Sequence, residues 1–171
     1  MPAKESFVAT LNETDLKLFI DSIRHYLKVT TRQEPQITSA FLGTGDVEGF
    51  EFNGLVTFSG SHNGHVIVSM PAKLVREILL LQHETDLSDS NLLDAVGEIA
   101  NTLAGNARKA LGPELQISVP IKLHGVQGIK ARVRKHPYVI TLSWDHYEAL
   151  VVRGHGTQAL KNTKHPHACR L

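Results

Sequence analysis

Residues 86–111 read DLSDSNLLDAVGEIANTLAGNARKAL and contain the longest predicted helix of the chain, over about 90–111. At about 100° per residue this helix has one broad apolar side, formed by Leu92, Val96, Ile99, Ala100, Leu103, Ala107, Ala110 and Leu111. The opposite side is polar and carries Asp94, Glu98, Asn101 and Gly105. Because Glu98 and Asn101 are three residues apart, their side chains lie one turn apart on the same side.

Two glycines, Gly97 and Gly105, lie inside this predicted helix, where each costs up to about 1 kcal/mol of helix stability relative to alanine. The cost suggests either close approach by another backbone or tight packing within the domain. Acidic and amide residues on the polar side of a helix are most often simply solvated. The spacing of Glu98 and Asn101 therefore does not by itself identify a function.

Upstream of this segment the sequence predicts a first helix that begins near Asn12, whose side chain can cap it, and that breaks at Thr30. Strand patterns follow at 36–42, 50–59 and 65–70. The dipeptide Asn63-Gly64 predicts a hairpin between the last two of these strands, because both residues tolerate positive φ. Pro71 then opens a second helix.

Downstream, Gly112-Pro113 ends the long helix, and three more strands are predicted at 117–125, 138–144 and 147–152. The order α-βββ-αα-βββ with short turns favours an α+β fold, with about six strands in a largely antiparallel sheet packed with three helices. We expect one domain over 1–153. The segment 154–171 lacks apolar periodicity and is expected to be a poorly ordered tail.

The composition excludes several classes of protein. Hydrophobic residues make up 42% and charged residues 20%, and 18 Lys and Arg almost balance 17 Asp and Glu. This balance gives no support to nucleic-acid binding, and no apolar run approaches the roughly 20 residues of a membrane-spanning helix. The first twenty residues lack a secretory signal pattern, and a single cysteine, Cys169, cannot form an internal disulfide. We therefore expect a cytoplasmic protein.

The segment 86–111 resembles the signature helix of the CheX/CheC chemotaxis phosphatases, which has a Glu-x-x-Asn core and an acidic residue four positions earlier. The residues that match this pattern in register or extend it are Asp94, Glu98, Asn101, Gly105 and Asn106. The pattern occurs once, as in the single-site CheX type. The order of elements and the glycine-containing strand pair at 50–70 are also similar to the family, so the resemblance covers about 12–153. Pro120 is the candidate for the family's downstream proline.

The resemblance implies a CheC-like fold and a protein substrate, the phosphorylated aspartate of a CheY-like response regulator. Asn101 would position the attacking water, because a neutral carboxamide both accepts and donates hydrogen bonds. Glu98 would anchor the receiver's active-site lysine. It is a poor candidate for a general base, since an exposed carboxylate titrates at about pH 4 and is a weak base at neutrality. Asp94 and Gly105 would contact the partner. Mg²⁺ would belong to the receiver, and we expect no cofactor or metal of the chain's own.

The resemblance also implies a homodimer joined through its sheets, with the strand region 136–152 as the expected edge. A second interpretation stays open, namely a non-catalytic receiver-binding or adaptor module of the same fold. The presence of both Glu98 and Asn101 favours the enzyme, because a module without catalysis has no need of that specific pair.

Other polar groups have simpler interpretations. His62 and His65 flank the predicted turn and are expected to be exposed. The histidines and cysteine near the C-terminus match no known zinc spacing; they are His155, His165, His167 and Cys169. A basic run favours a solvated edge strand over a site for phosphate or an acidic partner; it consists of Lys130, Arg132, Arg134 and Lys135.

Overall fold

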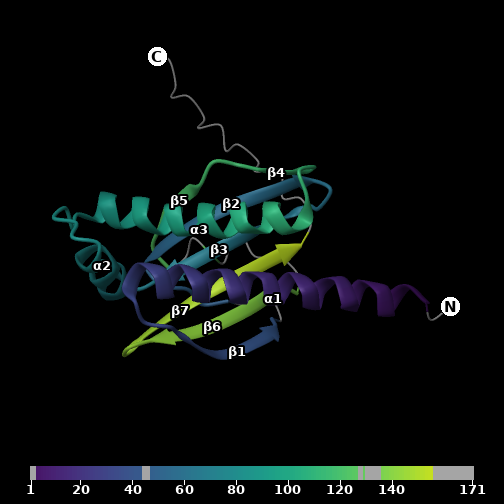
Figure 1. Ribbon diagram of the computed structural model, residues 1–171, viewed down its shortest axis with the longest axis horizontal. Helices are drawn as coiled ribbons and strands as arrows, with labels where there is room; N and C mark the ends of the chain where they lie inside the picture. The colour runs from purple at the N-terminus through teal and green to yellow at the C-terminus, as the bar shows by residue number, and fades with distance from the viewer. Residues whose placement is uncertain (1–2, 44–46, 127–128, 130–135, 156–171) are drawn as a thin grey trace, which may run out of the picture.

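Strands and helices alternate in blocks along the chain. The computed structural model describes residues 3–43, 47–126, 129 and 136–155. Its elements are α1 (Ala3–Thr31), β1 (Gln36–Leu42), β2 (Phe52–Gly60), β3 (Gly64–Met70), α2 (Ala72–Leu81), α3 (Asp89–Leu111), β4 (Leu115–Ile117), β5 (Ile121–His124), β6 (Tyr138–Trp144) and β7 (Tyr147–His155). All strand pairs are antiparallel, in the order β1-β6-β7-β3-β2-β4, with β5 also paired to β2. The predicted α+β class with three helices is confirmed (Figure 1).

The main core lies between one face of the sheet and the three helices. Alternate residues of each strand point to this face, as the period of a strand requires. Its fully buried side chains include Phe19, Ile23 and Leu27 from α1, Leu74 and Ile78 from α2, Leu92, Ile99 and Leu103 from α3, and Val66, Val68 and Val151 from the sheet. The apolar side predicted for the long helix is thus the side that packs on the sheet as far as Ala107, whereas Ala110 near the end of the helix is exposed, contrary to the prediction.

A smaller core covers the opposite face. Leu55, Ile67 and Val152 from the sheet meet Val47 and Ile129 from the connecting segments. Nearby, the buried Asn53 side chain donates from Nδ2 to the carbonyl oxygens of Phe50, Leu123 and Gly125, at 3.0, 3.2 and 3.3 Å. These bonds tie the chain before β2 to the chain around β5.

The sheet has seven strands in the described residues instead of about six, because the predicted strand 117–125 is interrupted. Ser118 accepts a hydrogen bond from Thr57 N through Oγ, at 3.0 Å, and its own N–H donates to Thr57 O at 3.0 Å. Pro120 has no N–H to donate to a ladder. The segment therefore divides into β4 and β5, which pair with different parts of β2.

Two elements are longer than predicted. α1 begins at Ala3 and not near Asn12, because the residues before Asn12 contain no glycine or proline after Pro2 to stop a helix. β7 continues through His155, so two residues of the predicted tail pair with β3. The rest of that tail, with His165, His167 and Cys169, lies outside the described residues.

Two further expectations were wrong. His65 is buried, with 5% of its surface exposed, because β3 lies inside the sheet and His65 pairs with Gly154 of β7. The strands within 136–152 are also interior, since β6 lies between β1 and β7. They cannot form a sheet edge. β1 is the edge on that side, and Phe41 and Leu42 on it are 49% and 52% exposed.

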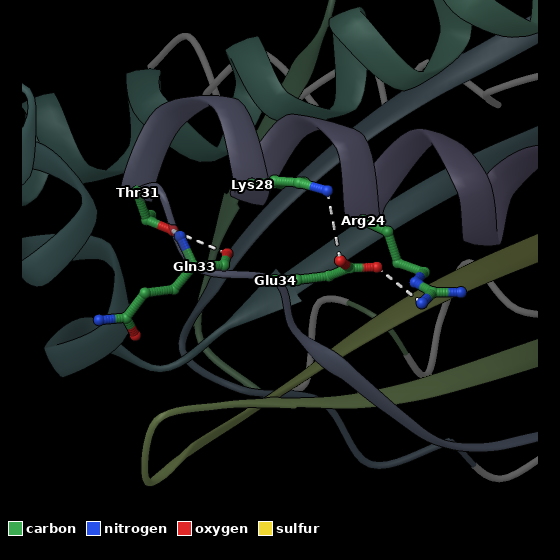
Figure 2. A network of polar contacts seen from close by, with 5 residues as sticks. All are labelled: Arg24, Lys28, Thr31, Gln33 and Glu34. Carbon is green, nitrogen blue, oxygen red and sulfur yellow. Dashed lines mark hydrogen bonds and ion pairs between the residues drawn. The ribbon is translucent and has the colours of Figure 1, made fainter.

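Polar contacts fix the end of α1 to the start of β1. Arg24 Nη2 and Lys28 Nζ of α1 lie 2.7 and 3.5 Å from the Glu34 carboxylate oxygens, and Gln33 N donates to Thr31 Oγ1 at 3.2 Å. These five residues are drawn in Figure 2. Thr31 also accepts a 3.0 Å hydrogen bond from Trp144 Nε1, which joins this turn to β6. In the part of the chain described, no helix has the length and apolarity needed to cross a membrane.

Candidate functional site

The candidate site is built on α3, whose two ends are defined by local signals. Ser88 is the N-cap and accepts a hydrogen bond from Asn91 N at 3.4 Å, and Asn91 Nδ2 donates to Asp86 O at 2.6 Å. The helix ends at Gly112, whose φ of 105° is in the range that favours glycine. The predicted helix over about 90–111 is confirmed at Asp89–Leu111.

Close contact between α3 and β2 holds the helix against the sheet. A Cβ atom added to Gly54 of β2 would lie 2.5 Å from Val96 O and 2.9 Å from Gly97 Cα. A Cβ atom added to Gly97 would lie 3.2 Å from Lys122 Cγ and 3.4 Å from Pro120 Cβ. Gly97 therefore serves packing within the domain. Gly105 differs, because a Cβ atom there would meet nothing within 4 Å.

The predicted site residues lie together on the outer side of α3. Asp94 and Glu98 are exposed, and Asn101 and Gly105 are half-buried. The Glu98 and Asn101 side chains form no hydrogen bond or ion pair with any other described residue. Both are thus available to a partner, as a site for a macromolecule requires.

Asp94 is already engaged, because its Oδ1 accepts from Lys122 Nζ of β5. Both side chains remain about half exposed, at 54% and 46%. Sequence reasoning missed Lys122. Its position in the short alternating run IKLH marks a strand residue, but only the pairing of Lys122 with Gly54 brings it under α3. Pro120, the predicted downstream proline, lies beside Gly97 on the same flank.

Tyr26 of α1 lies within electrostatic range of Glu98. Burial raises the pKa of Tyr26 above its ordinary value of 10.0, and the negative charge of Glu98 contributes in the same direction. Hydrogen bonds with Thr30 and Gln82 oppose the shift. The Glu98 carboxylate is therefore close to a tyrosine that stays protonated at neutral pH.

The described residues contain no group of three or more His, Cys, Asp or Glu that could hold a metal ion. The basic run of Lys130, Arg132, Arg134 and Lys135 lies outside the described residues. The chemistry available on α3 is accordingly that of an exposed carboxylate and a carboxamide one turn apart.

Comparison with known proteins identifies the family. A family model described as "Chemotaxis phosphatase CheX" matches residues 52–143, more than half of the chain and all of α3. The chain belongs to the CheX family. A search of curated protein sequences found no match.

Solved structures share the fold of this CheX-family chain. A putative chemotaxis protein from Desulfovibrio vulgaris Hildenborough has a TM-score of 0.69 at 21% identity, over 82% of this chain and 95% of that one. The chemotaxis protein CheX from Vibrio vulnificus has a TM-score of 0.69 at 18% identity, over 82% and 98%. A complex of CheX with CheY, BeF3 and Mg²⁺ from Borrelia burgdorferi has a TM-score of 0.65 at 19% identity, over 81% and 95%. At these identities the likeness establishes the fold.

Proposed function

We propose that this CheX-family chain is a phosphatase that hydrolyses the aspartyl phosphate of a CheY-like response regulator. The observation that carries the proposal is the pairing of Glu98 and Asn101 on the exposed side of α3, where neither bonds to another described residue. Membership of the chemotaxis phosphatase family supports the activity, and the Borrelia complex of CheX with CheY supports the class of partner.

An acyl phosphate is a reactive substrate, so its hydrolysis needs no strong nucleophile from the enzyme. Phosphoryl transfer is accelerated chiefly by alignment of the attacking water with phosphorus and by electrostatic stabilisation. The Asn101 carboxamide suits this role, because its oxygen accepts from water, its nitrogen can donate, and it stays neutral at any relevant pH. Asn101 is half-buried, which restricts its side chain more than full exposure would.

Glu98 is the candidate anchor for a receiver lysine. Its carboxylate is exposed, which favours attraction of a cation across an interface over general-base catalysis. Asp94, one turn before Glu98 on α3, would also contact the receiver. Its carboxylate forms an ion pair with Lys122. Gly105, one turn beyond Asn101, would let the partner approach the helix backbone. Any Mg²⁺ would be supplied by the receiver.

We also propose a homodimer, joined at β1 and not at the region 136–152. β1 is one edge of the sheet and pairs only with β6 among the described residues, and Phe41 and Leu42 on it are half exposed. An exposed edge strand is a ready site for pairing with a second chain.

The test of the activity follows the decay of a receiver phosphorylated with acetyl phosphate. Asn101→Ala is expected to lower kcat by about a hundredfold, because water alignment is lost. Glu98→Gln is expected to raise KM by about tenfold with a smaller effect on kcat. Glu148→Gln, which removes an exposed carboxylate on β7, is the matched control and should behave as wild type.

If the phosphorylated receiver loses its phosphate no faster with the wild-type protein than without it, the proposed phosphatase activity is refuted. Tight binding of the phosphorylated receiver in that same experiment would instead establish a non-catalytic receiver-binding module.

A further inference from the structure

A hollow of about 480 Å³ adjoins the proposed site at the C-terminal end of α3. It is lined by Gly105, Arg108, Lys109, Gly112, Pro113 and Ile117. This volume falls in the range of small binding pockets, about 300–1,000 Å³. Apart from the two charged groups, its walls are apolar, because the stems of arginine and lysine are aliphatic.

Gly105 has no structural role within the described part of the domain. A glycine in the middle of a helix costs up to about 1 kcal/mol relative to alanine, and at Gly97 close packing explains it. At Gly105 an added Cβ would meet nothing within 4 Å. The absence of a side chain there keeps the floor of the hollow open. Packing among the described residues therefore does not explain this glycine.

The charged residues that line the hollow are both basic. Arg108 and Lys109 are exposed, and neither side chain forms an ion pair with another described residue. Val119, two residues beyond Ile117 of the lining, is 81% exposed, the highest value among the large hydrophobic residues described. The Oγ atom of the preceding Ser118 donates to Val119 O at 2.9 Å. An apolar hollow with a basic rim favours an apolar side chain flanked by carboxylates.

We infer that this hollow is the second half of the receiver-docking surface, which seats an apolar side chain of the receiver beside acidic groups and selects among receivers. The inference rests on the proposed function. Gly105 follows Asn101 by four residues, about 6 Å along the helix. A stable interface covers about 800 Å² on each partner, so a receiver that places its phosphoaspartate at Asn101 must extend over neighbouring turns of α3. An aspartyl phosphate site is itself negative, which matches the basic rim.

The test fills the hollow without disturbing the fold. Gly105→Leu adds a side chain whose Cβ atom would meet nothing within 4 Å, and leucine is the better helix former, so this variant should fold. Ala110→Leu adds a larger side chain five residues further along α3, at an exposed position that does not line the hollow, and it is the matched control. The double variant Arg108→Glu, Lys109→Glu reverses the rim charge.

The assay uses a panel of purified CheY-like receivers, each phosphorylated with acetyl phosphate, at several salt concentrations. For the receiver that wild type prefers, Gly105→Leu is expected to raise KM by about tenfold while kcat at saturation stays within about twofold. The charge reversal is expected to raise KM at low salt and to weaken its dependence on salt. Both changes should reduce the preference among receivers, and Ala110→Leu should change neither parameter.

The two proposals can fail separately. If wild type accelerates receiver decay and both hollow variants match it in KM and preference, the inference is wrong and the phosphatase stands. If wild type binds a receiver without accelerating its decay, and Gly105→Leu weakens that binding while Ala110→Leu does not, the phosphatase is wrong and the docking surface stands.

Discussion

Gly54 of β2 lies directly beneath Gly97 of α3, so close that a Cβ atom at position 54 would come within 2.9 Å of the Gly97 Cα atom and 2.5 Å of Val96 O. Backbone atoms, which cannot rotate away, form this contact. The relationship sets the height of α3 above the sheet. It therefore also sets the position of Glu98, the next residue on that helix.

Gly54→Ala should destabilise the domain by about 1–3 kcal/mol, the usual cost of overpacking a filled core. We expect the variant to lose phosphatase activity as well, because α3 must shift. Urea unfolding measures the stability. Gly105→Ala is the matched comparison, since it adds the same methyl group on open surface and should stabilise by up to about 1 kcal/mol. Equal stability of the two variants would contradict this account of the contact.

A buried ion pair should fix α1 to the sheet. Arg153 Nη2 of β7 lies 3.3 Å from Asp15 Oδ2 of α1, and its guanidinium is 5.1 Å from the centre of the Phe58 ring. Asp15→Asn leaves the Arg153 charge buried without its counter-ion and should cost about 3–5 kcal/mol in unfolding free energy. Replacing both residues, as Asp15→Leu with Arg153→Met, should recover much of that loss. A double variant less stable than Asp15→Asn would contradict the explanation.

The ion pairs of Glu34, in the turn between α1 and β1, should make the stability of the fold depend on pH in the acid range. The hydrogen bond and charge of Arg24, with the charge of Lys28, hold the pKa of Glu34 below its ordinary value of 4.5. A carboxyl group with a lower pKa in the folded state stabilises the fold above its unfolded pKa, and this contribution is lost as the pH falls from about 4.5 through the folded pKa. Arg24→Ala should move the Glu34 pKa up toward 4.5 in an NMR titration. Arg76→Ala on α2 should leave it in place.

The proposed dimer should depend on β1. Phe41→Glu places a charge on the exposed edge strand and should convert a dimer into a monomer in size-exclusion chromatography with light scattering. Val29→Glu makes the same kind of change on α1, where Val29 is 65% exposed, and should leave the assembly unchanged. A wild-type protein that is monomeric at high concentration would rule out the dimer, and loss of assembly in Val29→Glu would rule out β1 as its specific site.

Much of the fold could be predicted because its signals are local. The apolar period of residues 92–111, the glycine and proline that follow, and the alternation in the strands each depend on near neighbours. The predicted helix 90–111 was confirmed within one residue. Local signals failed where a boundary depends on a distant partner. Ser118 bonds with Thr57 and divides one predicted strand into two, and His65 is buried because β7 pairs beside it.

Asp94, Glu98, Asn101 and Gly105 could be placed on one side of a single helix from their order in the chain, because helical geometry depends only on spacing. The sequence also carried the pattern that indicates the CheX family. The residues that surround that side could be identified only from the folded chain. The partner of Asp94 is Lys122, 28 residues away, and Gly97 is explained by packing while Gly105 is not. These differences depend on which strand lies under each turn of α3, and strand pairing joins residues that no local pattern relates.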